Sequence, residues 1–157
     1  MGFATHLGPW LLGTNRYTTG TTAGTVRNTG ATIVSQDKEV LFNDADNTVA
    51  FALPAGARVT GFQFITTTTF TAASTITLSI GGVAITGALT VTSPGVYNFV
   101  AATTEAAAAL WDNVGATDAL VTYTVSQGAS SAGVGTLVAN YVVRNSDGAT
   151  HPTSTQN

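Results

Sequence analysis

Apolar and polar residues alternate in short stretches along most of the chain. In residues 75–80, for example, Ile76, Leu78 and Ile80 are separated by single threonines or serines, so they lie on one face of an extended strand. Comparable stretches bounded by turn residues predict strands at 31–36, 39–42, 49–53, 58–68, 83–85, 89–91, 96–100, 120–126 and 137–143. This pattern predicts an all-β protein, a single antiparallel β-sandwich, with a jelly roll as the favoured topology.

Three turn signals divide these strands. Gly81-Gly82 predicts a two-residue hairpin, and Ser93-Pro94-Gly95 predicts a type II turn. The run Asn43–Asn47 begins like a calcium loop, but it lacks the central glycine and the closing glutamate of an EF-hand. We therefore interpret it as a turn in which Asn and Asp side chains bind the backbone. The Gly- and Ser-rich loop 127–135 predicts that the last two strands form a closing pair.

One segment departs from the β pattern. Glu105–Asp112 contains four alanines, which favour a helix, and its glutamate stands in the first turn, where it suits the helix dipole. We predict one short helix here.

The two ends of the chain differ from its middle. We predict an extended N-terminal arm with a Gly/Thr-rich tether at residues 1–24, a β-sandwich domain at 25–145, and a polar C-terminal tail at 146–157. The arm carries bulky apolar residues that would be a liability in water, so we expect a partner to bury them. The alternative is that they fold back onto their own domain. The candidate partner-binding residues are Leu7, Pro9, Trp10, Leu11, Leu12, Arg16 and Tyr17.

Charge is sparse, and this favours an assembly. Charged residues make up 8% of the chain, against roughly 25% in an average soluble domain. A surface of threonine, serine and small apolar side chains loses little when another protein covers it. The alternative is a stable, secreted protein with a nearly neutral surface.

The composition argues against several classes of partner. The net charge is −3 and the five basic residues are scattered, whereas nucleic-acid binding needs clustered cations. No apolar run is long enough to span a membrane. We predict no secretory signal, because the N-terminus lacks a basic region and glycine and proline interrupt its apolar stretch. There is no cysteine and therefore no disulfide.

The residues available for catalysis are few. Nucleophilic catalysis needs serine or cysteine beside a base, but the two histidines, His6 and His151, stand near the chain ends. The only glutamates are Glu39 and Glu105, and a catalytic pair with Asp44 or Asp112 is the remaining alternative. We predict no enzymatic activity, no cofactor and no metal site. Aromatic residues at strand spacing predict core packing rather than a sugar-stacking platform: Phe62, Phe64, Phe70, Tyr97, Phe99, Tyr123 and Tyr141.

Two stretches carry a resemblance to known proteins. They are LGPWLLGTNRYTTGTTAGTVRNTGATIVSQ at residues 7–36 and ALVTYTVSQGASSAGVGTLVANYVVRN at residues 119–145. Together they resemble small virion structural proteins of marine short-tailed bacteriophages. The resemblance covers about a third of the chain. It lies in the composition and residue order of these stretches rather than in a catalytic motif.

The resemblance implies a capsid decoration or cement protein that binds the outside of the phage head and bridges major capsid subunits. Its partners would be the major capsid protein and copies of itself, with a homotrimer expected because capsids offer three-fold positions. Such a protein would be made in the host cytoplasm and reside on the capsid surface. The alternative is a head-fibre or tail-associated adhesion module that binds host surface carbohydrate.

Overall fold

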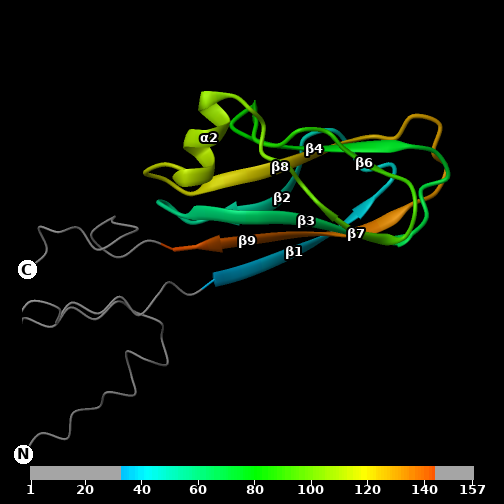
Figure 1. Cartoon of the computed structure of the whole chain (residues 1–157), viewed down its shortest axis with the longest axis horizontal. Coiled ribbons are helices and arrows are strands. Elements are labelled where there is room, and N and C mark those ends of the chain that lie inside the picture. The colour runs from blue at the N-terminus through cyan, green and yellow to red at the C-terminus, as the bar shows by residue number, and fades with distance from the viewer. Residues whose placement is uncertain (1–32, 144–157) are drawn as a thin grey trace, which may run out of the picture.

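The computed structural model describes residues 33–143, which form two antiparallel sheets packed face to face (Figure 1). The first sheet has the order β1 (Ile33–Leu41), β9 (Val134–Val142), β3 (Arg58–Thr68) and β7 (Gly95–Asn98). The second has the order β2 (Thr48–Leu53), β8 (Ala119–Ser126), β4 (Ser74–Ile80) and β5 (Val83–Ala84), with β6 (Leu89–Val91) also paired to β4. The predicted all-β antiparallel sandwich is confirmed. The jelly roll stays a prediction.

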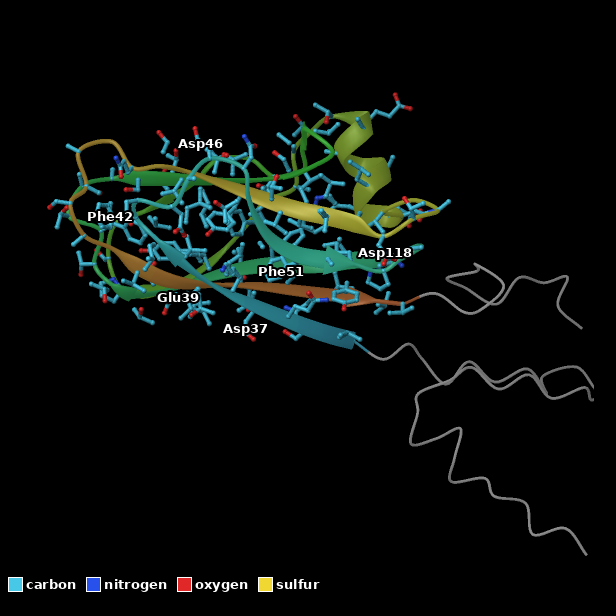
Figure 2. The ribbon with its side chains drawn as sticks, turned by 180° about the vertical axis from the view of Figure 1, so that it is seen from behind. Asp37, Glu39, Phe42, Asp46, Phe51 and Asp118 are labelled. Carbon is cyan, nitrogen blue, oxygen red and sulfur yellow. The ribbon has the colours of Figure 1, made fainter. Side chains whose placement is uncertain are left out.

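The core lies between the sheets and follows the alternation seen in the sequence. The predicted inward residues of β4 are buried, and β3 adds Phe62 and Phe64 from the opposite sheet. Phe51 of β2 lies among them (Figure 2). The predicted aromatic core residues are buried with one exception: Tyr97 is half-buried and donates a hydrogen bond to the Ser93 carbonyl.

The predicted short helix is confirmed with its bounds, as α2 (Glu105–Asp112). The Thr104 side chain accepts a hydrogen bond from the Ala107 backbone N–H and caps the first turn. Trp111 anchors the helix to the sandwich, because its indole N–H donates to the Ile85 carbonyl at 2.8 Å. Its ring meets Phe62 edge to face, with centroids 5.5 Å apart.

The predicted pairing of the last two strands is wrong. β8 pairs with β2 and β4 in the second sheet, whereas β9 pairs with β1 and β3 in the first. The loop between them therefore crosses from one sheet to the other. Each of these strands is apolar on one face and has two neighbours, so each gains more as a central strand than as half of a hairpin.

Three local predictions also need correction. The separate strands expected at 31–36 and 39–42 are one continuous strand, β1, within the described residues. The apolar alternation at 49–53 predicts that Val49 shares the buried face of Phe51, but a register shift between them leaves Val49 48% exposed. Gly95 does not adopt the positive φ of a type II turn; it begins β7 and pairs with Thr66.

Thr66 offers a direct test of the packing. It is buried, and its hydroxyl makes no hydrogen bond with any described residue. A buried hydroxyl without a partner is costly, so Thr66→Val, which replaces it with a methyl group of similar size, should raise the free energy of unfolding by about 1 kcal/mol. Urea denaturation of the two proteins measures this difference. If Thr66→Val instead lowers the free energy of unfolding by a similar amount, the hydroxyl has a hydrogen-bond partner in the folded protein.

Candidate partner-binding surface

The seven partner-binding residues predicted in the N-terminal arm lie outside the described residues, as do the whole arm (1–24) and the whole polar tail (146–157). The structure therefore describes the surface of the sandwich itself.

Charge is unevenly distributed over this surface. Residues 33–143 contain seven acidic side chains against two basic ones, a net charge of −5. No charged residue occurs between Arg58 and Glu105, and none between Asp118 and the end of the described range. The charges therefore lie on β1, the turn after it, the start of β3, α2 and the loop before β8. Figure 2 shows Asp37 and Glu39 along β1, with Asp118 at the opposite end of the sandwich from Phe42.

The outer face of the second sheet carries a small array of hydroxyl groups. On β4 and β8 every second residue enters the core, so the residues between them point outward. The strands align these outward residues in three cross-strand pairs. We call this surface the hydroxyl face, and its members are Thr75 with Ser126, Thr77 with Thr124, and Ser79 with Thr122.

The hydroxyl face has no charge, and apolar side chains flank it. Leu120, near the start of β8, is 53% exposed, and the exposed Val49 of β2 pairs with Thr122. Thr124 Oγ1 already accepts a hydrogen bond from the Asn47 backbone N–H. A partner that covered the three pairs alone would not have to remove water from any ion, which is the costliest kind of desolvation. The exposed Asp46, next to Asn47 in the turn, lies at the edge of this face.

The turn that resembled a calcium loop has a structural role. The Asp44 carboxylate accepts hydrogen bonds from the Leu41 backbone N–H at 2.8 Å and from the Tyr123 hydroxyl at 2.5 Å. The Thr48 hydroxyl donates to the Ala45 carbonyl. These contacts confirm the turn interpretation and tie the β1–β2 connection to β8. Among the described residues, no three histidine, cysteine, aspartate or glutamate side chains are grouped as metal ligands.

Tyr123 should make the stability of the domain sensitive to alkali. Burial raises the pKa of its hydroxyl well above the usual range, and the Asp44 carboxylate raises it further. The unfolded chain releases this proton near pH 10 and the folded chain only at higher pH, so the free energy of unfolding falls as pH rises above about 10.

Tyr123→Phe removes this ionisation and the hydrogen bond to Asp44. We expect the free energy of unfolding to be lower by about 1.5 kcal/mol at neutral pH, and to decline less steeply with pH above pH 10 than in the parent. Chemical denaturation between pH 7 and pH 11 measures both effects. Equal alkaline slopes in the two proteins would show that Tyr123 does not carry this dependence.

The acidic residues weighed as catalytic candidates occupy separate elements. Glu39 is exposed on β1, and Glu105 begins α2, which packs against β3 and β5. Asp44 is held in its turn, and Asp112 lies 3.7 Å from Arg58 in a solvent-exposed ion pair. Within residues 33–143 no helix has the length and apolar character needed to cross a membrane.

Sequence reasoning did not single out the hydroxyl face. Its signal is present in two stretches, TITLS at 75–79 and LVTYTVS at 120–126, where hydroxyl residues alternate with the core residues. The alternation shows that these residues face outward. It does not show that β4 and β8 are neighbours, which depends on pairing between distant segments.

Comparisons with known proteins give one structural similarity. No family model matches the chain, and no curated protein matches it. A chain from the solved structure titled "Acidic stable capsid structure of Helicobacter pylori bacteriophage KHP30" has a similar fold, with a TM-score of 0.50 and 14% sequence identity. The match covers 74% of this chain and 91% of that chain. At this identity the likeness shows the fold: the sandwich resembles a chain from a phage capsid structure.

Proposed function

We propose that this chain is a non-enzymatic structural protein of a bacteriophage virion, and more narrowly a decoration or cement protein on the outside of the head. The observation that carries the proposal is the likeness to a chain of a phage capsid structure. The match covers 91% of that chain. The resemblance of residues 7–36 and 119–145 to phage virion proteins points the same way. In this proposal the protein bridges major capsid subunits and forms a homotrimer at three-fold positions.

The surface chemistry supports a role in assembly. The hydroxyl face is uncharged and lies on two neighbouring strands, so major capsid subunits can cover it without burying an ion. We propose it as the contact surface of the sandwich. Many copies bound to one head would hold it together through individually weak contacts.

The N-terminal arm would supply the second contact. Leu7, Pro9, Leu11 and Leu12 surround Trp10 in the sequence, and a buried tryptophan is a common centre of binding energy. Trp10→Ala should then weaken the free energy of binding by about 2 kcal/mol per copy, which is at least a tenfold loss of affinity for capsids. Deletion of residues 1–13 should weaken binding in the same way and leave the melting temperature unchanged. If the shortened protein melts several degrees lower but still binds normally, the arm belongs to the core.

The proposal is tested by binding to heads of the phage whose genome encodes this chain. Purified protein should sediment with empty expanded heads and saturate at a fixed number of copies per major capsid subunit. Failure to bind these heads, together with retention on host polysaccharide, would favour the adhesion alternative.

A further inference from the structure

A hollow of about 610 Å³ opens on the first sheet near α2, on the opposite side of the sandwich from the hydroxyl face. Four strands and the helix contribute to it: β1, β3, β7, β9 and α2. Its lining residues are Ile33, Thr60, Gly61, Phe62, Gln63, Asn98, Phe99, Trp111 and Asn140.

The hollow exists because β3 is irregular at a glycine. The register of β3 against β9 shifts between Val59 and Gly61, and Gly61 pairs with Asn140. A Cβ atom placed on Gly61 would have no neighbour within 4 Å. The sheet therefore has open space at a position where a side chain would ordinarily stand.

Three carboxamide side chains border this open space. Asn140 lies across from Gly61 on β9, Gln63 follows two residues later on the same face of β3, and Asn98 pairs with Gln63 from β7. The Gln63 side-chain N–H donates to Asn98 Oδ1 at 3.0 Å, which holds the two amides in fixed relative positions. Trp111 forms part of the wall, and its hydrogen bond to Ile85 and its contact with Phe62 keep it in place.

We propose that this hollow is a binding site for a neutral carbohydrate. Each sugar hydroxyl is both a donor and an acceptor, and each carboxamide supplies both functions. The apolar face of a sugar ring needs an aromatic surface beside these polar groups, and Trp111 supplies one. This inference does not depend on the capsid proposal, since the site and the hydroxyl face lie on different sheets.

The same residues argue against other ligands. No lining residue is charged, and the described domain has a net charge of −5, so a phosphate or an acidic sugar would find no cation to pair with. An apolar peptide such as residues 7–12 could offer the three carboxamides only its backbone N–H and C=O groups, and none of its aliphatic side chains would hydrogen-bond to them.

The test uses the full-length protein labelled with ¹⁵N and a panel of neutral oligosaccharides built from glucose, galactose, mannose or N-acetylglucosamine. We expect at least one to shift the side-chain amide signals of Gln63, Asn98 and Asn140. Gly61→Leu, which fills the open space, should weaken that binding at least tenfold, and Asn140→Ala should weaken it measurably. Thr124→Ala, on the hydroxyl face, is the matched control and should bind as the parent does.

Three results would overturn the proposal. One is that no neutral oligosaccharide shifts these amide signals at millimolar concentration. Another is that a sugar binds with equal affinity to Gly61→Leu. The third is that a peptide of residues 1–32 shifts the same signals and no sugar does, which would make the hollow a docking site for the chain's own N-terminal segment. Binding of Gly61→Leu to phage heads, measured in parallel, should equal that of the parent protein. Loss of sugar binding and loss of head binding are therefore separate outcomes, so failure of the sugar site and failure of the capsid proposal can be told apart.

Discussion

Gly135→Ala should destabilise the domain by about 3 kcal/mol. Gly135 lies in β9 under the ring of Phe64, and a Cβ atom there would come within 2.6 Å of Phe64 Cε1 and 2.9 Å of the Ile65 carbonyl oxygen. Phe64 is fully buried, so its ring cannot move aside without disturbing the core. Thermal denaturation should show a fall in melting temperature of roughly 10 °C.

Two further variants make this prediction specific. Gly61→Ala, on the neighbouring strand β3, adds the same methyl group where nothing lies within 4 Å, and it should change stability little. Phe64→Leu shortens the side chain that blocks Gly135, so it should be less harmful in the Gly135→Ala background than in the parent. Equal losses for Gly135→Ala and Gly61→Ala would contradict the packing described for β3 and β9.

Thr77→Lys should reduce head binding by at least a hundredfold and leave the sandwich folded. Thr77 stands in the middle of the hydroxyl face, opposite Thr124. If capsid subunits cover this face, the new ammonium group is buried without a partner, which costs roughly 3–5 kcal/mol. At about 1.4 kcal/mol per factor of ten, the affinity falls by two orders of magnitude or more.

The matched control is Ser35→Lys on β1. Ser35 is exposed on the other sheet, so the same charge placed there should leave head binding unchanged. Circular dichroism should show both variants folded. Normal head binding by Thr77→Lys would show that the hydroxyl face is not the contact surface.

Local patterns predicted the elements of this fold well, because each depends on residues close in sequence. β3 and α2 have the predicted bounds, and the Gly81-Gly82 turn has positive φ at both glycines. The errors arose where a distant segment decides the outcome. Val49 is exposed because β2 shifts its register against β8, and no feature of its own sequence requires that shift.

The surfaces were harder to predict than the core. Alternation marks Thr77 and Thr124 as outward-facing, but only the pairing of β4 with β8 places them side by side. The hollow draws Asn140, Gln63 and Asn98 from three strands, around a glycine whose importance comes from an irregularity in β3. Sequence reasoning used Trp111 only as part of a helix and did not foresee its place in this wall.

The proposed function is tested most directly by composition and imaging of the virion. Mass spectrometry of purified particles of the encoding phage should find this chain in a fixed ratio to the major capsid protein. Electron cryomicroscopy should show a two-sheet density of its size on the outer surface of the head, at positions between capsid subunits. Absence of the chain from purified virions, or its location on the tail alone, would contradict the proposed role.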